Sequence, residues 1–522
     1  MLRTLLFLAS GSLVLTFAQT PCDNLKSVPL PDATITALEL IPAGLAPALP
    51  PPPRPEGEPP AQARGSAAER PAPPPPDPMA LAVMLPAYCR VALTLKPSTD
   101  SDIKMEVWMP AGNWNNKFEM AGNGGWAGSI QGFAQMRQAL REGYATAGTD
   151  TGHTGSDPRF SLGHPDKLVD FAYRSVHDTV LKSKALIKAF YGRDPKLSYW
   201  NSCSTGGREG LMEAQKYPAD FDAVIAGAPA NYQTHLHAWD MMVATAVRKN
   251  DSFVSTAKLN ALNKAVMAAC DASDGVKDGL LNDPRKCKFD PAALLCKGES
   301  KDDCLTPAEL DSVKLVYSPA KRKDGTLIFP GKEPGSEATW TMLSQRTAAP
   351  AELSMGTFQY ATYQDANWNW RDFNLDRDTA AADEKFGYVN ATSDLTAFKN
   401  RGGKLVLYHG WNDTGISPEN TINLYKSIVQ KTGPDPGNWI KLYMIPGMGH
   451  CRGGPGTDQF NKMGIIERWR ESNIAPQAVL AAHVSGNQVT MTRPLCPYPQ
   501  VATYNGVGST NDAASFSCKA PK

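Results

Sequence analysis

The stretch LSYWNSCSTGGREG, residues 197–210, decides the fold of this chain. Residues 197–200 have the composition of a strand and residues 208–216 that of a helix, so the small residues around Ser204 form a sharp turn between them. A serine on such a turn is typical of a nucleophile elbow. The N-terminus of the following helix would favour negative charge that develops beside this serine. We therefore predict that Ser204 is a nucleophile; the alternative is a serine-rich turn that only caps a helix.

Strands and helices alternate on both sides of this turn. Residues 91–95 and 103–108 alternate polar and apolar side chains like antiparallel strands, and apolar residues at helical spacing predict a helix over 171–191. Further strands are expected at 144–147, 221–226, 404–408 and 439–444, with a helix at 419–430. Strands that alternate with helices imply a parallel sheet joined by right-handed crossovers. Together with the elbow, this pattern predicts an α/β-hydrolase domain.

The alternation is interrupted between residues 233 and 393. This segment contains four of the ten cysteines, an acidic loop and an aromatic-rich stretch at 358–373. We interpret it as a separate domain, inserted between two parts of the hydrolase domain at 19–232 and 394–522.

A nucleophilic serine needs a histidine base and an acid that orients the imidazole. In α/β-hydrolases both follow the nucleophile along the chain, the acid first. His450 lies in a glycine-rich loop after the last expected strand, and Asp413 follows the strand before it. We predict that Asp413 and His450 form a catalytic triad with Ser204. His409 is the second candidate for the base, and His177, which lies within a helix, is expected to be structural.

Two segments near the N-terminus are predicted to lie outside the folded domains. Residues 1–18 have a basic start, a short apolar run and a small residue, Ala18, before the expected cleavage point, as in a signal peptide. An uncleaved anchor is the alternative. Residues 47–78 are rich in proline and lack the large apolar side chains that offset the entropy of ordering. We predict a disordered insertion there, and a secreted or periplasmic protein.

The ten cysteines agree with export, because an even number favours disulfides in an oxidising compartment. The competing interpretation is a zinc site, but the sequence has no CxxC pair. Cys203 directly precedes the predicted nucleophile, and Cys451 directly follows the predicted base. A disulfide between them would join the two catalytic loops.

Charge excludes some classes of partner. The chain of 522 residues has 53 Lys and Arg against 52 Asp and Glu, a net charge of +1. Such a balance gives no reason to expect nucleic acid or an anionic membrane as a partner. After residue 18 no apolar run is long enough to span a membrane. The oligomeric state is left open by the sequence.

These residues resemble the tannase and feruloyl esterase family, which has a CS-D-HC arrangement and includes mono(2-hydroxyethyl) terephthalate hydrolases. The matching residues are Cys203-Ser204, Asp413 and His450-Cys451. The resemblance extends from about residue 88 to residue 518, with Ser202 in place of the family's usual glycine and with the proline-rich insertion as departures. It implies five disulfides: Cys22 with Cys89, Cys203 with Cys451, Cys270 with Cys287, Cys296 with Cys304, and Cys496 with Cys518.

The resemblance also implies that the inserted domain is a lid with a structural Ca²⁺ ion. Three carboxylates within the stretch 271–278 suit a hard cation that takes six to eight oxygen ligands. The implied ligands are the carboxylates of Asp271, Asp274 and Asp278 and the backbone carbonyls of Val276 and Leu280. The alternative is a solvated acidic turn.

An oxyanion hole requires two N–H donors. We expect one from Thr205, the residue after the nucleophile. The other should come from the glycine-rich loop 122–126, where we name Gly125, with Gly124 as the alternative.

The predicted reaction is hydrolysis of a small aromatic carboxylic ester through an acyl-enzyme. By the resemblance the acyl group is galloyl, feruloyl or related, with terephthaloyl as an alternative. Thr205 is the residue expected in tannases and feruloyl esterases, which favours phenolic esters. Aromatic residues of the lid are candidates for stacking on the substrate: Tyr360, Trp368, Trp370 and Phe373. A serine peptidase and a non-catalytic binding protein on the same scaffold are the alternatives from other classes.

Overall fold

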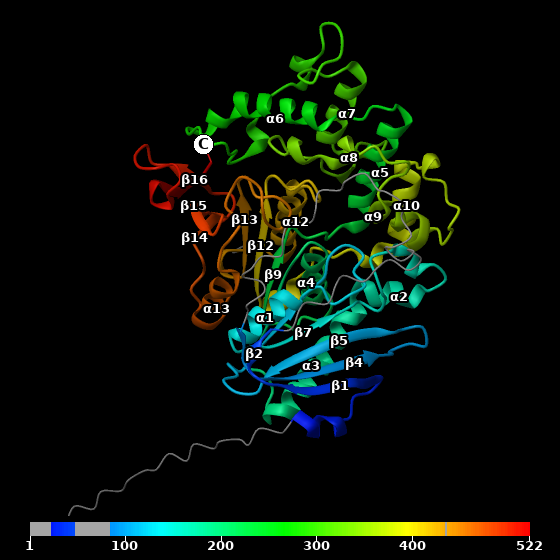
Figure 1. Ribbon diagram of the computed structural model, residues 1–522, viewed down its shortest axis with the longest axis vertical. Coiled ribbons are helices and arrows are strands. Elements are labelled where there is room, and N and C mark those ends of the chain that lie inside the picture. Colours follow the sequence, from blue (N-terminus) through cyan, green and yellow to red (C-terminus); the bar gives the residue numbers. More distant parts are fainter. Residues whose placement is uncertain (1–21, 47–83, 434–435, 522) are drawn as a thin grey trace, which may run out of the picture.

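A nine-stranded mixed sheet forms the centre of the computed structural model, which describes residues 22–46, 84–433 and 436–521 (Figure 1). The predicted signal peptide and the proline-rich insertion at 47–78 lie outside the described residues. In their order across the sheet, the strands are β1 (Ala33–Ile41), β4 (Tyr88–Leu95), β5 (Ile103–Pro110), β7 (Ala145–Thr149), β6 (Lys117–Ala121), β8 (Leu197–Cys203), β9 (Ala223–Gly227), β12 (Lys404–Gly410) and β13 (Ile440–Ile445). Neighbours from β1 to β7 are antiparallel, and those from β7 through β6 to β13 are parallel.

Helices cover both faces of this sheet. Side chains of α3 (Ser175–Tyr191), α4 (Thr205–Lys216) and α12 (Pro418–Thr432) pack in the core of one face. The helices α1 (Phe133–Arg141) and α13 (Lys462–Ser472) pack on the other. Strands covered on both faces are apolar throughout, and β9 is accordingly buried at every residue. The predicted α/β-hydrolase fold is therefore confirmed.

Most expected elements are present, and three differences concern the elbow and the central sheet. The helix after the elbow begins at Thr205, three residues earlier than expected, because the turn itself consists of Ser204 alone. The strand β1 was not predicted, and its alternating face is only partly buried because it is the sheet edge. The strand β6 was not predicted either, since its sequence KFEMA has a charged residue, Glu119, at its centre.

Between β9 and β12 the chain leaves the sheet and forms a helical lid. Its main helices are α5 (Gln233–Lys249), α6 (Thr256–Cys270), α7 (Pro307–Tyr317) and α10 (Leu375–Phe386). These helices share a hydrophobic core that is separate from the cores of the sheet. In Figure 1 the lid lies above the sheet, green to yellow. Hydrogen bonds connect it to the loop after β12: Lys332 Nζ donates to Gly415 O, and Asn412 Nδ2 donates to Gly335 O.

All ten cysteines form disulfides, and the five pairs are the ones that the resemblance implies. The alternative of a cysteine zinc site is therefore wrong. Two of the disulfides lie within the lid, and one joins the C-terminal hairpins β14 (Val479–Ser485) with β15 (Gln488–Leu495) and β16 (Val501–Tyr504) with β17 (Phe516–Lys519) at their bases.

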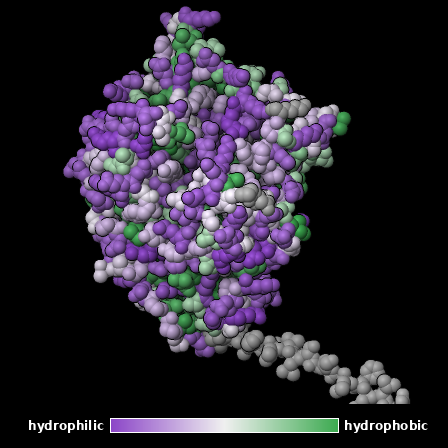
Figure 2. Space-filling view, turned by 180° about the vertical axis from the view of Figure 1, so that it is seen from behind, coloured by the Kyte–Doolittle hydropathy of each residue, from purple (hydrophilic) through white to green (hydrophobic). Residues whose placement is uncertain are grey.

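Polar side chains dominate the surface seen in Figure 2, and the apolar ones form small separate groups. In the part of the chain that the structure describes, no helix combines the length and apolar character needed to cross a bilayer.

Candidate active site

Ser204 lies at the junction of β8 and α4, in a backbone conformation that few residues other than glycine adopt. Its φ is 66° and its ψ is −127°. Its N–H donates to Gly227 O of the neighbouring strand at 2.9 Å, which fixes the turn against the sheet. A Cβ at position 206 would lie 2.0 Å from Ser202 Oγ, so only glycine fits there. The predicted elbow is thus present, and Gly206 makes room for the serine that replaces glycine at position 202.

The three predicted triad residues lie in one hydrogen-bonded series. Ser204 Oγ and His450 Nε2 are 2.8 Å apart, and His450 Nδ1 and Asp413 Oδ2 are 2.7 Å apart. Because a carboxylate only accepts, Nδ1–H donates to Asp413, and Nε2 is left to accept the serine hydroxyl. Asp413 is fully buried, whereas about a third of the His450 side chain is exposed. The base therefore lies at the surface of the site and its acid lies beneath it.

Asp413 is held by four hydrogen bonds. Its Oδ1 accepts from the backbone N–H groups of Gly415 and Ile416 at 2.8 and 2.9 Å. Its Oδ2 accepts from His450 and also from His409 Nε2 at 2.9 Å. Burial alone would raise the pKa of Asp413, but the charge of His450 and the hydrogen bonds from both imidazoles outweigh it and hold that pKa well below its usual range. Asp413 is therefore an ionised carboxylate at neutral pH.

His409, the second candidate for the base, lies on the far side of Asp413 from the nucleophile. It is fully buried, and its Nδ1 lies 2.7 Å from Thr421 Oγ1. Since Nε2–H donates to Asp413, Nδ1 accepts from the threonine hydroxyl. The sequence predicted His409 as a possible base and not as a donor to Asp413. The burial of a residue at the end of a strand cannot be read from its local sequence pattern.

The glycine-rich loop 122–126 lies over the start of α4, as an oxyanion loop requires. Gly206 N–H donates to Asn123 O at 2.8 Å, and Thr205 Oγ1 donates to Gly125 O at 3.0 Å. Buried Glu209 accepts from both the N–H and the side-chain amide of Asn123, at 3.0 and 3.3 Å. Both predicted donors, Thr205 and Gly125, thus belong to two segments that are bonded directly to each other. Glu209, which fixes this contact, was not predicted.

The disulfide between Cys203 and Cys451 joins the residue before Ser204 to the residue after His450. These residues are 248 positions apart in sequence, and their Cα atoms are 6.0 Å apart. The bond therefore connects the end of β8 directly to the loop after β13.

Most of the lid aromatics proposed for substrate stacking pack inside the lid. Trp370 belongs to its hydrophobic core. Trp368 and Phe373 are partly buried and pack against this core, where they contact the ring of Phe358. Tyr360 is also buried, at 8% exposure. These rings therefore pack within the lid, and no contact among the described residues places them beside the catalytic residues.

A short lid helix, α9 (Glu352–Gly356), contacts the oxyanion loop instead. Its Leu353 carbonyl accepts from Trp126 Nε1 at 2.8 Å, and a Cβ at Gly125 would lie 3.7 Å from Leu353 Cδ1. The Leu353 side chain is 47% exposed beside this loop. It is an apolar lid residue next to the site that the sequence did not single out.

The acidic loop 271–280 follows α6, and the disulfide between Cys270 and Cys287 closes it. Burial raises the pKa of Asp274 to about 6; backbone N–H groups oppose this rise, and the charges of Asp278 and Asp271 add to it. Their carboxylate oxygens accept backbone N–H groups of the same loop, and Asp278 also accepts from Arg493 at 2.8 Å. The chemistry of these three carboxylates fits a hard cation, which would replace some of these bonds. Their oxygens do not all lie within 4.8 Å of one another in this structure, so binding would draw them together.

Comparison with known proteins matches one family over most of the chain. The family model described as tannase and feruloyl esterase matches residues 89–519. The chain belongs to this family. An uncharacterised esterase of Xanthomonas campestris is 35% identical over 99% of this chain and 94% of that protein, and a probable feruloyl esterase B-2 of Aspergillus terreus is 35% identical over 82% of this chain and 86% of that protein.

Solved structures of the family share the fold. The crystal structure of feruloyl esterase B from Aspergillus oryzae has a TM-score of 0.83 and 30% identity, and the match covers 95% of this chain and 99% of that one. Tannin acyl hydrolase from Aspergillus niger has a TM-score of 0.76 at 20% identity, covering 96% and 95% of the two chains. The hydrolase fold is therefore common to these proteins.

Proposed function

We propose that this family member is a serine esterase that hydrolyses small esters of aromatic acids through an acyl-enzyme. The observation that carries the proposal is the hydrogen-bonded series from Ser204 through His450 to Asp413. An ionised, buried carboxylate, an imidazole that is about one-third exposed and a serine on a strained turn together provide an orienter, a base and a nucleophile.

In the proposed reaction, His450 Nε2 takes the hydroxyl proton as Ser204 Oγ attacks the ester carbonyl carbon. The N–H groups of Thr205 and Gly125 face the oxygen that becomes negative. His450 then gives its proton to the leaving alkoxide or phenoxide as the C–O bond breaks. A water molecule then attacks the acyl carbon and gives a proton to the same imidazole. The acid is released as the bond from this carbon to Ser204 Oγ breaks and the imidazolium returns the proton to Ser204 Oγ. Asp413 stays ionised and balances the imidazolium in both halves of the reaction.

The choice of acyl group rests on the relatives. Proteins named feruloyl esterase B share about a third of the residues, and a tannin acyl hydrolase shares the fold. We propose feruloyl, galloyl or related phenolic esters, with the half-exposed apolar Leu353 as one wall for the acyl ring. Terephthaloyl monoesters are the second candidate.

Two further properties belong to the proposal. Five disulfides suit an oxidising compartment, so we propose a secreted or periplasmic enzyme. We also propose that Asp271, Asp274 and Asp278, with the carbonyls of Val276 and Leu280, hold a structural Ca²⁺ ion in the lid. Such an ion supplies positive charge that offsets the repulsion of the three carboxylates, and it takes no part in the ester chemistry.

The test is a comparison of hydrolysis rates for methyl ferulate, methyl gallate, mono(2-hydroxyethyl) terephthalate, p-nitrophenyl acetate and a peptide anilide. We expect the phenolic esters to have the highest kcat/KM. Ser204→Ala should lower kcat on the order of 10⁴–10⁶-fold without altering the circular dichroism spectrum. Near-normal turnover by this variant would contradict the mechanism, hydrolysis of the anilide alone would indicate a peptidase, and no turnover of any substrate would indicate a binding protein.

A further inference from the structure

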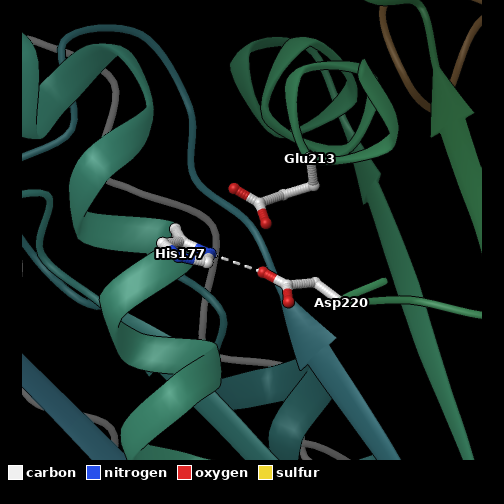
Figure 3. Close-up of side chains that lie close together, drawn as sticks. All are labelled: His177, Glu213 and Asp220. Atoms are coloured by element: carbon white, nitrogen blue, oxygen red, sulfur yellow. Dashed lines mark hydrogen bonds and ion pairs between the residues drawn. The ribbon is translucent and has the colours of Figure 1, made fainter. Parts of the chain in front are cut away.

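A second cluster of ionisable side chains lies away from the catalytic triad, on the face of the sheet that α3 and α4 cover. His177 comes from α3, Glu213 from the last turn of α4, and Asp220 from the loop that leads to β9. Each offers one ligand atom to the group, and these atoms all lie within 4.8 Å of one another. Figure 3 shows both carboxylates turned toward each other and toward the imidazole. Within the described residues, no other group of three His, Cys, Asp or Glu side chains brings its ligand atoms this close together.

Glu213 is the unusual member of this cluster. It is 1% exposed, and neither of its carboxylate oxygens has a hydrogen-bond donor. It faces the Asp220 carboxylate, and two carboxylates can share a hydrogen bond only if one of them is protonated. An unpaired buried carboxylate costs several kcal/mol, so a polar group of this kind calls for a partner.

The other two members of the cluster, His177 and Asp220, are hydrogen-bonded to each other. His177 Nδ1 lies 2.6 Å from Asp220 Oδ2, and the imidazole stacks on the Tyr217 ring with centroids 3.5 Å apart. Lys184 Nζ donates to the backbone carbonyl of Asp220 at 2.5 Å, which fixes this residue without occupying its carboxylate. The hydrogen-bonded pair of His177 and Asp220 thus lies beside the Glu213 carboxylate. The imidazole is the most exposed of the three groups, with 22% of its side chain exposed.

We propose that His177, Glu213 and Asp220 bind a divalent transition-metal ion, with Zn²⁺ as the first choice. One imidazole nitrogen and two carboxylate oxygens are ligands that Zn²⁺ accepts in a four-coordinate site, and water from the side of His177 supplies the fourth. Ca²⁺ does not suit this group, because it takes six to eight oxygen ligands. The ion gives Glu213 the partner that it lacks.

The ion has a structural position. It connects α3 to the C-terminal end of α4, and α4 carries Ser204 at its other end. The ammonium of Lys184 lies close by and reduces the net negative charge of the cluster, so the ion is bound by its ligand geometry more than by the field around it. We expect the ion to stabilise the fold and to leave ester chemistry at the distant nucleophile nearly unchanged.

The experiment uses the full, mature chain, stripped with a chelating resin and then kept in excess Ca²⁺ so that the acidic lid loop is satisfied. Zn²⁺ is titrated by calorimetry, and Co²⁺ is added to a second sample as a spectroscopic substitute. We expect one equivalent of each ion, a visible Co²⁺ absorption band typical of nitrogen and oxygen ligands, and a rise in melting temperature with Zn²⁺. Glu213→Gln and His177→Gln should each weaken Zn²⁺ binding by more than about tenfold.

Asp274→Ala, in the lid loop, is the matched control and should bind Zn²⁺ as the wild type does. The circular dichroism spectrum of each variant reports whether it is folded, and the Co²⁺ spectrum of the wild type needs no variant at all. The proposal is overturned if the wild type binds no Zn²⁺ or Co²⁺, or if Glu213→Gln and His177→Gln bind them unchanged.

Discussion

At the scale of single residues, the backbone of Ser204 is held by its neighbours and not by its own preference. A non-glycine residue at φ 66° and ψ −127° is strained. The close packing of Gly206 against Ser202 and of Gly207 against Gly227 holds the turn in this conformation. The serine at position 202, which departs from the usual motif, fits because its Oγ occupies the place that a Cβ at position 206 would need.

Gly206→Ala should therefore lower kcat on the order of a hundredfold, since the new Cβ would lie 2.0 Å from Ser202 Oγ and displace the elbow. Adding Ser202→Gly removes the obstruction and leaves Asn123 N as the next contact, at 3.1 Å. The double variant should recover most of the activity, and Ser202→Gly alone should behave like the wild type. Steady-state kinetics of the four proteins measures this. Equal losses in the single and double variants would show that another contact forces glycine at 206.

His409 gives a second prediction at this scale. Its N–H donates to the ionised Asp413, and such a bond contributes about 1.5–3 kcal/mol. His409→Leu should lower kcat by about tenfold to a hundredfold with little change in KM, because the residue is buried away from the substrate. His409→Gln can still donate an N–H and should lose less. If His409→Leu were as inactive as His450→Ala, His409 would have to be the base after all.

At the scale of elements, the sequence predicted those parts of the site that depend on chain order. Ser204, Asp413 and His450 each follow a strand of a parallel sheet, and the ends of such strands meet at one edge. The pairing of buried polar groups could not be predicted in the same way. Glu209 under Asn123 and His409 behind Asp413 are defined by contacts between distant segments, which no local pattern records.

The missed strand β6 shows the same limit. Its central Glu119 is buried and accepts from Gln135 Nε2 and Asn201 Nδ2, so a charge stands where the pattern of a buried strand requires an apolar residue. Burial raises the pKa of Glu119 to about 7, and the hydrogen bonds from Gln135 and Asn201 only partly oppose this. The carboxyl group is thus neutral in the folded protein at mildly acidic pH.

This raised pKa has a consequence for stability. Between about pH 4.5 and 7 the folded state keeps a proton on Glu119 that the unfolded state has lost, so the free energy of unfolding should fall as the pH rises through this range. The loss amounts to on the order of 3 kcal/mol. Glu119→Gln keeps the acceptor oxygen and does not titrate. Urea unfolding at several pH values should show the stability difference between wild type and variant changing by this amount, and a constant difference would contradict the raised pKa.

At the scale of the whole molecule, the lid and the catalytic loops are connected through the acidic loop. Leu280 packs against Gly447, which lies in the loop that carries His450. A Cβ added to Gly447 would lie 2.5 Å from Leu280 Cδ2. Its neighbour Leu281 packs against Gly335, and Gly335 O accepts from Asn412, next to Asp413. The order of the acidic loop therefore affects the positions of both the base and its acid.

Removing calcium should accordingly lower both the melting temperature and the activity. An ion at a hundredfold excess over its dissociation constant stabilises the folded state by about 2.7 kcal/mol, and its loss releases the repulsion among Asp271, Asp274 and Asp278. In protein stripped of all metal and reloaded with Ca²⁺ alone, we expect a chelator to lower the melting temperature of the wild type and, well below that temperature, to reduce kcat several-fold. Added Ca²⁺ should restore both, whereas Zn²⁺ should not restore kcat. Asp274→Ala should have the melting temperature and kcat of the chelated wild type. The chelator should change neither value further, because the calcium ligand set of this variant is incomplete. Identical melting curves for wild type and variant, with and without chelator, would mean that the loop is a solvated acidic turn. A chelator effect that persisted in Asp274→Ala would place the ion elsewhere in the molecule.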